Sequence, residues 1–411
     1  MATRTPALDG WLGVAAVRNA QERTRDLVRR TPVLTSRSLS DECGGTVLLK
    51  AENLQRTGSF KLRGALAKVD PIAAAAGGAV VAGSAGNHAQ SLAYAARARG
   101  LACEVFMPAE ASLAKVAAVR GFGGTVRLGG ESVDECVAFA RERAQETGAV
   151  FVHPFDDPEI VAGQGTLGLE LLDEVDDLAT VVVPVGGGGL IGGVAGVVKA
   201  ERPGVRVIGV QAESCSAYPA SLARGEPVEA RAGPTIADGI AIKRPGALTL
   251  PLVREWVDEI VVVAENDVAE AMVVLLERAK LVVEGAGAVG VAALLSGAVV
   301  PAASGATVVV LSGGNVDANV LATVALRHET AEGRRLRFFT RVEDRPGGLA
   351  RLLTRIADAG GNLVTVTHVR EAVPLHIRQT GVDLLLETRG ADHAAEIVAA
   401  LEQAGYEIER S

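Results

Sequence analysis

The chain has 411 residues, of which 48% are hydrophobic and 22% charged, and it carries a net charge of −8. This length suits two or three domains at ~150 residues each, and the hydrophobic content excludes wholesale disorder. The negative charge gives no electrostatic reason to expect nucleic acid or an anionic membrane as a partner.

The cysteines and the N-terminus bear on the cellular compartment. Cys43, Cys103, Cys136 and Cys215 form no pair at metal-ligand or redox spacing, so we interpret them as reduced thiols. The N-terminal Met-Ala-Thr-Arg-Thr-Pro has no apolar signal core. Both observations favour a cytoplasmic protein.

Short Val-rich strands alternate with helical stretches, such as Asp267–Lys280, through most of the chain. Few of the strands alternate with polar residues, which is typical of strands covered on both faces. The pattern therefore predicts an α/β fold with a largely parallel sheet and helices on both sides. The predicted strands are Ala79–Ala82, Cys103–Met107, Thr125–Leu128, Val150–Val152, Thr180–Val185, Val205–Val210, Ile260–Val263 and Thr307–Leu311.

Residues Gly285–Val316 contain no charge and are long enough to cross a bilayer. However, Pro301 and Ser304-Gly305 interrupt the stretch, and Thr307–Leu311 has the composition of a strand. We therefore predict a buried helix followed by a buried strand, and no membrane partner.

The composition changes at Arg327–Arg335, a polar run that we interpret as a linker. Beyond it, patterning predicts strands over 336–342, 363–369, 382–387 and 406–409, and helices over 349–356 and 391–404. The order β-α-β-β-α-β is the ferredoxin-like plan, here in ~75 residues. It predicts a separate C-terminal domain.

The first segment that could carry chemistry is Thr57–Ala65, which contains Lys61. A lysine is usually a solvated charge. Here the flanking Gly and Phe suit a lysine held against an apolar wall, where desolvation would lower its pKa and free a nucleophilic amine. Lys50, close by, is the natural control for Lys61 and is expected to tolerate alanine much better.

A second segment, Val80–Ala89, predicts a strand, a tight turn and a helix that begins near Gly86. Backbone N–H groups at a helix start attract a carboxylate or phosphate. Asn87 and His88 are placed to reach such a ligand. An ordinary helix cap with a buried, satisfied His88 is the alternative.

The glycine run Gly186–Gly189 follows the strand Thr180–Val185. Its backbone could curl so that several N–H groups converge on one phosphate, although a steric role in helix–sheet packing is the alternative. The run also matches Gly-x-Gly-x-x-Gly from Gly187 to Gly192, which alone is a weak signal for a nicotinamide-dependent oxidoreductase. That hypothesis leaves Lys61 and Ser312 unexplained.

A fourth segment, Ser312-Gly313-Gly314-Asn315, follows the strand Thr307–Leu311. In open α/β sheets, ligands bind beyond the carboxyl ends of strands. The three strand-end loops and Lys61 therefore predict one shared cleft.

In order and spacing these four motifs resemble the threonine dehydratases (threonine ammonia-lyases) of the tryptophan-synthase-β-like pyridoxal-phosphate enzymes, over roughly residues 10–330. The tail resembles an ACT domain, an amino-acid-sensing module, through Asp344-Arg345-Pro346-Gly347. The resemblance implies a two-lobed, fold-type II catalytic domain over 1–330, with a smaller lobe roughly at 55–155. A regulatory ACT domain would follow over 335–411.

The resemblance also implies roles for individual residues around pyridoxal 5'-phosphate. Lys61 would hold the cofactor as a Schiff base and then take the substrate Cα proton. Phe60 would pack beside the ring, Asn87 would hydrogen-bond the ring hydroxyl oxygen, and Ser312 would face the pyridine nitrogen. The phosphate would be bound by Gly186, Gly187, Gly188, Gly189 and the Leu190 amide. The loop that receives the substrate carboxylate would be Ser84, Ala85, Gly86, Asn87 and His88.

A neutral hydroxyl at Ser312 cannot hold the ring nitrogen protonated as an aspartate does, so the ring is a weaker electron sink and loss of a β-hydroxyl competes well. Elimination of water from L-threonine would give 2-oxobutanoate and ammonia. L-Serine is an alternative substrate, since one methyl group changes binding by only ~1–3 kcal/mol. Related serine racemases have a serine acid where this chain has Ala85, which cannot donate a proton. A lyase is therefore expected, with a serine or threonine racemase as the alternative.

The resemblance has consequences for metals, effectors and assembly. Where serine racemases bind a divalent cation, this chain has Glu213, Ala217 and Pro219, so no metal site is expected. In the tail, Asp344, Pro346, Gly347, Gly348 and Asn362 would bind the carboxylate of a free amino acid. Isoleucine or valine would be the allosteric effector if the enzyme serves isoleucine biosynthesis, and a structural dimerisation domain is the alternative. We expect a homo-oligomer, a dimer or tetramer.

Overall fold

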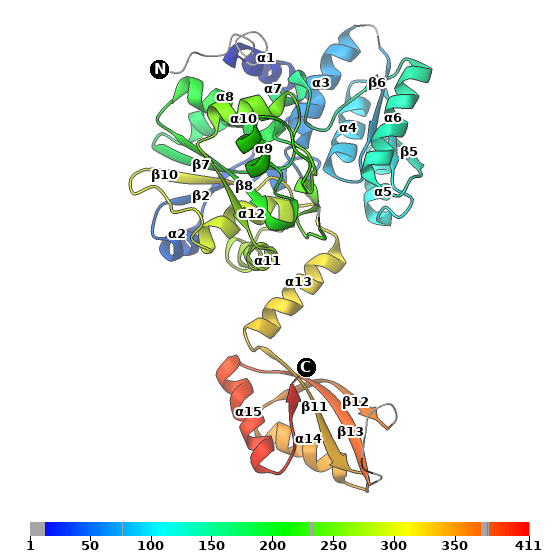
Figure 1. Ribbon diagram of the computed structural model, residues 1–411, viewed down its shortest axis with the longest axis vertical. Helices are drawn as coiled ribbons and strands as arrows, with labels where there is room; N and C mark the ends of the chain where they lie inside the picture. Colours follow the sequence, from blue (N-terminus) through cyan, green and yellow to red (C-terminus); the bar gives the residue numbers. More distant parts are fainter. Residues whose placement is uncertain (1–12, 76, 231–232, 371–375, 377, 411) are drawn as a thin grey trace. The chain divides into compact units, whose positions relative to one another are not determined.

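The computed structural model describes residues 13–75, 77–230, 233–370, 376 and 378–410 (Figure 1). The chain divides into two compact units, the first ending at Ala318 and the second beginning at Asn319. The N-terminal segment without an apolar signal core lies outside the described residues. Among the described helices, none is long and apolar enough to cross a membrane.

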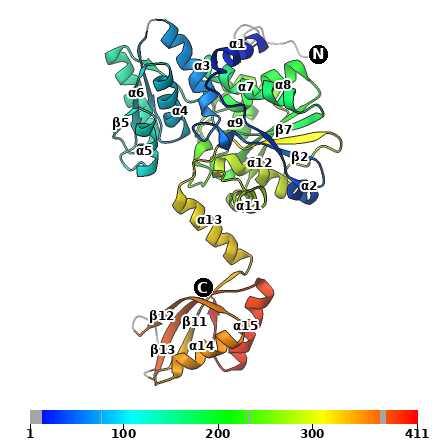
Figure 2. The ribbon, with the colours of Figure 1, turned by 180° about the vertical axis from the view of Figure 1, so that it is seen from behind.

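The first unit contains two sheets, and Figures 1 and 2 show the smaller one beside the larger. The larger sheet has the order β1-β2-β10-β7-β8-β9, with only the β1–β2 pair antiparallel. Its strands are β1 (Val33–Thr35), β2 (Val47–Lys50), β7 (Leu178–Pro184), β8 (Arg206–Ala212), β9 (Glu259–Val263) and β10 (Ala306–Val310). The smaller, parallel sheet has the order β5-β4-β3-β6, with β3 (Ala79–Gly83), β4 (Ala102–Met107), β5 (Thr125–Leu128) and β6 (Val150–Phe151). The predicted parallel α/β fold is confirmed.

Helices connect the strands and cover both sheets. The α-helices are α1 (Val14–Thr24), α2 (Arg37–Cys43), α3 (Lys61–Ala74), α4 (Asn87–Ala98), α5 (Leu113–Gly121), α6 (Val133–Thr147), α7 (Pro158–Glu174), α8 (Gly189–Glu201), α9 (Tyr218–Arg224), α10 (Thr249–Trp256), α11 (Glu265–Val274) and α12 (Gly285–Leu295). Short helices are η1 (Glu52–Leu54), η2 (Glu213–Cys215), η3 (Asp238–Ile240) and η4 (Leu275–Ala279). The uncharged stretch forms the buried helix α12 followed by the buried strand β10, as predicted.

The predicted helix Asp267–Lys280 differs in detail from the one observed. α11 ends at Val274 and passes into the π-helical turn η4, and Lys280 then adopts a left-handed φ of 59°. Among the described residues, Lys280 is the one non-glycine residue with a positive φ. The chain therefore changes direction sharply shortly before Glu284, the residue that precedes α12.

Small residues let the helices of the first unit approach closely. On α7, a Cβ added to Gly163 would lie 2.7 Å from the Cα of Gly64 on α3. Each sheet has its own apolar core, built around Val181, Ile191 and Val310 in the larger and around Leu66, Val80 and Leu92 in the smaller. Close backbone packing thus fixes α3, the helix that begins at Lys61, against α7.

A cluster of buried charges also joins α3 to α7 and to the larger sheet. We call it the Arg63 cluster: Lys50, Glu52, Arg63 and Glu170, each at most 4% exposed. The Arg63 guanidinium donates two hydrogen bonds to Glu52 at 2.8 Å and two to Glu170 at 2.7 and 2.8 Å. Lys50 Nζ lies 2.8 Å from Glu170. Buried charges are tolerated when they are paired and hydrogen-bonded in this way, whereas removal of one partner leaves the others buried without a compensating charge.

The second unit is a four-stranded antiparallel sheet of order β12-β13-β11-β14 with a β-α-β-β-α-β element order, as predicted. Its elements are β11 (Arg335–Glu343), α14 (Gly348–Asp358), β12 (Asn362–Val369), β13 (Gln379–Glu387), α15 (Ala391–Gln403) and β14 (Glu409–Arg410). Phe338, Leu352, Leu384 and Ile397 form the centre of its core.

The predicted linker Arg327–Arg335 is wrong over its first half. Helix α13 (Ala318–Ala331) runs through these residues and ends just before the turn at Gly333. Alanine, leucine, arginine and glutamate are strong helix formers, and their propensity outweighs the polar character of the run.

Candidate active site

A cavity of about 690 Å³ lies at the carboxyl ends of β3, β7 and β10 in the first unit. This volume is typical of small-molecule sites. Every residue that was predicted to bind cofactor or substrate lines it: Phe60, Lys61, Ser84, Ala85, Gly86, Asn87, His88, Gly186, Gly187, Gly188, Gly189, Leu190 and Ser312. The four sequence motifs thus meet around one space.

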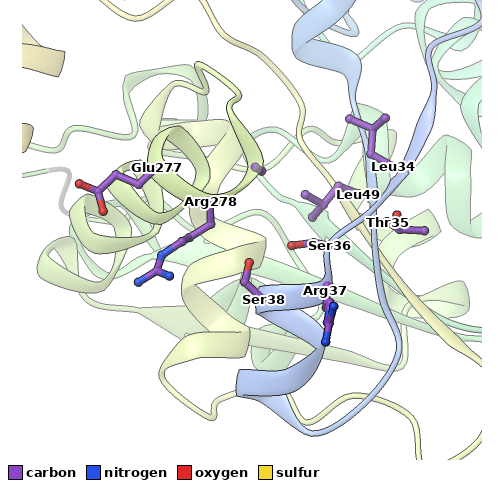
Figure 3. A pocket seen from close by; sticks show the side chains of 9 residues that line it. Leu34, Thr35, Ser36, Arg37, Ser38, Leu49, Glu277 and Arg278 are labelled. Atoms are coloured by element: carbon purple, nitrogen blue, oxygen red, sulfur yellow. The ribbon is translucent and has the colours of Figure 1, made fainter.

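A second cavity, of about 460 Å³, is lined by residues of β1, β2, α2 and η4 (Figure 3). It shares no lining residue with the first. Its charged residues, Arg37, Glu277 and Arg278, are exposed to solvent. Since it has no buried titratable group among its lining residues, the larger cavity is the candidate active site.

Lys61 is the first residue of α3, and its side chain ends in the larger cavity. Nζ donates a hydrogen bond to the Pro154 carbonyl at 2.8 Å and lies 5.1 Å from the centre of the Phe60 ring. Burial lowers the pKa of Lys61 to about 8, although the nearby Glu284 carboxylate favours the charged form. A substantial fraction of the amine is therefore neutral near physiological pH, as a nucleophile requires.

Lys50 is not the simple control for Lys61 that the sequence suggested. It is fully buried in the Arg63 cluster, with Nζ 2.9 Å from Glu174 in addition to Glu170, and it donates to the Thr31 carbonyl at 2.7 Å. Its replacement by alanine would leave Glu170 buried without this partner, a loss of about 3–5 kcal/mol of stability. We therefore expect Lys50→Ala to destabilise the protein, which makes Lys50 a poor control for Lys61.

The glycine run forms the turn from β7 into α8. Gly188 has a left-handed φ of 92°, and a Cβ there would lie 1.9 Å from the Tyr218 hydroxyl. Tyr218 and Thr249 both donate hydrogen bonds to the Gly187 carbonyl, at 3.2 and 2.5 Å. Because C=O and N–H point in opposite directions across a trans peptide, this anchoring turns the Gly188 N–H away from Tyr218.

The glycine turn fits a phosphate group. The N–H groups of Gly187, Gly188, Gly189 and Leu190 donate no hydrogen bond to any of the described residues. They stand at the start of α8, where the helix dipole favours an anion. A Cβ at Gly187 would lie 2.3 Å from the Phe155 ring, so larger residues would not fit here. The residues present therefore suit the phosphate of pyridoxal 5'-phosphate.

The Ser84–His88 loop passes from β3 into α4. The Gly86 N–H donates to Ser84 Oγ at 3.3 Å, and Gly86 precedes the first helical residue, Asn87. The His88 ring donates from Nε2 to the Val152 carbonyl at 3.0 Å, and burial lowers its pKa to about 3. His88 is thus a neutral, satisfied side chain that supports the loop.

Asn87 lies in a chain of polar groups that ends on a buried acid. Its Nδ2 donates to Glu284 Oε1 at 2.7 Å, and its Oδ1 accepts from Asn315 Nδ2 at 2.7 Å. Asn315 Nδ2 also donates to the Thr57 carbonyl at 2.8 Å. Glu284 is 5% exposed, and burial raises its pKa to about 7.

Ser312 is buried at the end of β10, on the cavity wall. Its Oγ lies 3.5 Å from the Ala286 carbonyl, at the limit of a hydrogen bond, while its own carbonyl accepts from the Phe60 N–H at 3.0 Å. The hydroxyl can therefore turn toward a ligand nitrogen, whereas the backbone is held beside Phe60.

Several residues of the site were not found by sequence reasoning. No role was assigned to Glu284, which stands before a Gly-Ala-Gly-Ala run, and Tyr218 and Thr249 follow Gly187 by 31 and 62 positions. Phe155 and His153 also line the cavity, and burial lowers the pKa of His153 to about 4. A buried acid at the start of the apolar helix α12 is the one signal that could have drawn attention to Glu284.

The residues predicted to bind an effector lie in the second unit. Asp344 accepts two hydrogen bonds from Arg370 at 2.8 and 2.9 Å, and Asn362 donates to Glu387 at 2.8 Å. Gly347 has a left-handed φ of 84° and precedes α14, which begins at Gly348. At the position where serine racemases bind a divalent cation, Glu213 Oε1 accepts a hydrogen bond from the Glu265 N–H at 3.2 Å.

Known proteins resemble the chain along most of its length. It is 46% identical to the L-threonine ammonia-lyase of Geobacter sulfurreducens over 395 residues, which are 96% of this chain and 98% of the relative. It is 45% identical to the L-threonine ammonia-lyase of Thermotoga maritima over 393 residues, which are 95% and 98% of the two chains. Alignments of this length include most of the second unit.

Solved structures also resemble the chain, over about three quarters of its length. A threonine deaminase from T.th. superposes with a TM-score of 0.69 at 42% identity, over 74% of this chain and 99% of that chain. Maize serine racemase superposes with a TM-score of 0.72 at 34% identity, over 79% and 99%. Residues 24–314 match the family described as pyridoxal-phosphate dependent enzyme, and they contain the motifs that line the cavity except for Asn315. The chain therefore belongs to the pyridoxal-phosphate dependent enzymes.

Proposed function

We propose that this protein is a threonine ammonia-lyase, which converts L-threonine to 2-oxobutanoate and ammonia by elimination of water. The observation that carries the proposal is the Lys61 amine in a cavity with a phosphate cradle, within a chain 46% identical to an L-threonine ammonia-lyase over 96% of its length. L-Serine, which lacks one methyl group, is expected as a poorer substrate.

Pyridoxal 5'-phosphate, when bound, supplies an electron sink that makes the substrate Cα proton removable. Gly186 to Gly189 and the Leu190 amide would hold its phosphate, Phe60 would pack beside its ring, and Asn87 would donate to its ring oxygen. The Lys61 amine would hold the cofactor and would then accept the substrate Cα proton. Because burial lowers the pKa of Lys61 to about 8, this amine can both accept and release a proton near neutral pH.

The Ser84–His88 loop binds the substrate carboxylate through backbone N–H groups at the start of α4, where the helix dipole favours an anion. Ser312 presents a neutral hydroxyl to the pyridine nitrogen. A neutral hydroxyl would not hold that nitrogen charged as a carboxylate would, which would favour loss of the substrate's β-hydroxyl over return of the proton to Cα.

The second unit acts as an ACT domain that binds isoleucine or valine and changes the affinity of the first unit for threonine. Its β-α-β-β-α-β fold and the Asp344–Gly348 turn at the start of α14 support this role. The protein works as a cytoplasmic homo-oligomer in isoleucine biosynthesis, and Asn362 completes the effector site.

A direct assay tests the proposed activity. Purified protein with pyridoxal 5'-phosphate is given threonine or serine, and 2-oxo acid and ammonia are measured in equal amounts. We expect a higher kcat/KM for threonine than for serine. Absence of 2-oxo acid from both amino acids would overturn the proposal.

Serine racemase is the competing function, because maize serine racemase shares the fold at 34% identity. A racemase needs an acid on the face of the cofactor opposite the lysine, and Ala85 lines the cavity where those enzymes have a serine. We predict little D-isomer after partial turnover of L-serine, measured by chiral chromatography. Ala85→Ser should increase the D-serine to 2-oxo acid ratio, and abundant D-serine from the unchanged protein would instead favour the racemase.

A further inference from the structure

The loop Ser312–Asn315 is joined to the loop that precedes Lys61. The Phe60 N–H donates to the Ser312 carbonyl at 3.0 Å, and the Gly314 N–H donates to the Gly58 carbonyl at 2.9 Å. Ser59 and Gly313 form an isolated β-bridge between these bonds. The two loops therefore hold each other in register, although they lie far apart in the sequence.

Asn315 is held in one orientation by this pairing. Its Nδ2 donates to the Thr57 carbonyl at 2.8 Å, and a carbonyl oxygen can only accept. Its Oδ1 lies close to the backbone of Gly58, because a Cβ added to Gly58 would be 2.4 Å from this oxygen. Gly58 also has a left-handed φ of 74°. The backbone of the Thr57–Gly58 turn thus fixes which end of the Asn315 amide carries nitrogen.

The orientation passes from Asn315 to Asn87. Because Asn315 presents its NH2 group, the Asn87 atom facing it at 2.7 Å must be the acceptor Oδ1. Asn87 Nδ2 then lies on the other side and donates one hydrogen to Glu284 at 2.7 Å. Its second amide hydrogen finds no acceptor among the described residues, and Asn87 lines the cavity.

We propose that Asn315 is a positioning residue that turns the NH2 group of Asn87 toward the cavity, so that the site offers a donor to an ionised ligand oxygen at this point. The inference rests on the cofactor contact proposed above for Asn87, and it adds the reason why Asn87 acts there as a donor. A reversed amide would present Oδ1 to the same oxygen, and two acceptors repel each other.

Asn315→Asp is the sharpest test, because a carboxylate donates to neither Thr57 nor Asn87 and instead accepts from the Asn87 NH2 group. In the full-length protein with pyridoxal 5'-phosphate alone, we expect the band near ~410 nm to lose intensity to a shorter-wavelength band. We also expect the cofactor Kd to rise about tenfold. Asn315→Ala, which frees the amide without reversing it, should show a smaller rise in Kd.

A double-mutant cycle separates positioning from general damage. If Asn315 acts through Asn87, Asn315→Asp has no further effect on the spectrum or Kd in an Asn87→Ala background. An equal effect in both backgrounds would overturn the proposal. Neither readout uses threonine, so a failed lyase assay and a failed positioning test are distinguishable.

Asn53→Ala is the matched control. Asn53 is also a buried asparagine beside the same loop, and its Nδ2 donates to the Val282 carbonyl at 3.1 Å. A Cβ added to Gly314 would lie 3.1 Å from the Cβ of Asn53. Asn53 makes no hydrogen bond to Asn87. We expect Asn53→Ala to keep the wild-type absorbance spectrum and cofactor Kd. A change in spectrum and Kd as large as that of Asn315→Asp would overturn the positioning role of Asn315.

Discussion

At the scale of single residues, the cavity holds a half-buried amine, Lys61, and a buried acid, Glu284, whose pKa values are displaced toward each other. Burial lowers the pKa of Lys61 to about 8 and raises that of Glu284 to about 7. Desolvation disfavours the charged form of both an amine and an acid, which explains the opposite directions. Such pairs are typical of active sites.

Lys61→Ala should abolish the absorbance near ~410 nm and nearly all turnover, because the same amine anchors the cofactor and moves the proton. Absorbance spectra and 2-oxo acid formation measure both effects. Lys68→Ala is the control, since Lys68 lies on the same helix and is partly exposed beside Asp157. Appreciable turnover by Lys61→Ala without added amines would show that the assignment is wrong.

Glu284→Gln should change how the stability of the cofactor-free protein depends on pH. Because the pKa of Glu284 rises from 4.5 to about 7 on folding, the folded state binds the proton more tightly. The free energy of unfolding therefore falls as pH rises from about 4.5 to 7, by about 3 kcal/mol. Glutamine does not titrate, so the variant should lack this fall.

Urea unfolding at pH 4.5 and pH 8 measures the difference. Asp238 and Lys115 contribute charge near Glu284 and stay unchanged in the variant. Glu255→Gln, at an exposed position on α10, controls for the substitution itself. The same pH dependence in wild type and Glu284→Gln would contradict the prediction.

Residue identity could be predicted from the sequence only where a motif is local. Lys61 and the Ser84–His88 loop are read from neighbouring residues. Glu284 touches Asn87 across 197 positions of sequence, and the contact depends on the turn at Lys280. Long-range side-chain contacts of this kind follow from packing, which one sequence does not display. The same reason explains why the burial of Lys50 was not predicted, since its charged partners, Glu170 and Glu174, lie on α7.

At the scale of elements, the glycine turn between β7 and α8 should be intolerant of any side chain. Gly188→Ala places a Cβ 1.9 Å from the Tyr218 hydroxyl at a left-handed φ. We expect at least a tenfold rise in the Kd for pyridoxal 5'-phosphate, equal to about 1.4 kcal/mol. Absorbance titration of the cofactor-free protein measures it.

Gly297→Ala is the matched control for this substitution. Gly297 also has a positive φ, 74°, but no atom lies within 4 Å of an added Cβ. Gly297→Ala therefore introduces the same backbone strain, about 1–2 kcal/mol, without a steric clash in the glycine turn between β7 and α8. Equal cofactor binding by both variants would indicate that the turn does not hold the phosphate.

The long, Val-rich strands were predictable because burial on both faces leaves a continuous apolar run. The two short strands β1 and β2 were not. β2 lies between β1 and β10 in the larger sheet, yet it spans only Val47–Lys50 and ends on a charge. The charge of Lys50 is paired only within the Arg63 cluster, through residues distant in sequence. The residues around β2 alone therefore do not indicate an inner strand of the sheet.

At the scale of the whole molecule, the proposed regulation requires the second unit. A chain ending at Ala331 should retain turnover of threonine but lose any shift of the saturation curve by isoleucine or valine. In the full chain that shift corresponds to a coupling of about 1–3 kcal/mol. Initial-rate curves with and without each amino acid measure it.

A full-length variant provides the control for truncation. Asn362→Ala removes a side chain that now donates to Glu387, and it should weaken the effector response while turnover is retained. Identical responses from the full and shortened chains would place the effector site in the first unit. No response from either would make the second unit a structural domain.

The Arg63 cluster has a consequence for how the chain matures during synthesis. Lys50, Glu52 and Arg63 leave the ribosome well before Glu170, and buried charges are stable only when all their partners are present. Until residue 170 has emerged, Arg63 remains hydrated, and the first turn of α3 cannot pack in its final position. Lys61, two positions earlier on that helix, is therefore ready for the cofactor only after the strand β2 and helix α7 have docked together. The glycine turn Gly186–Gly189 and Ser312, which also line the cavity, emerge later still, so binding of pyridoxal phosphate is a late event.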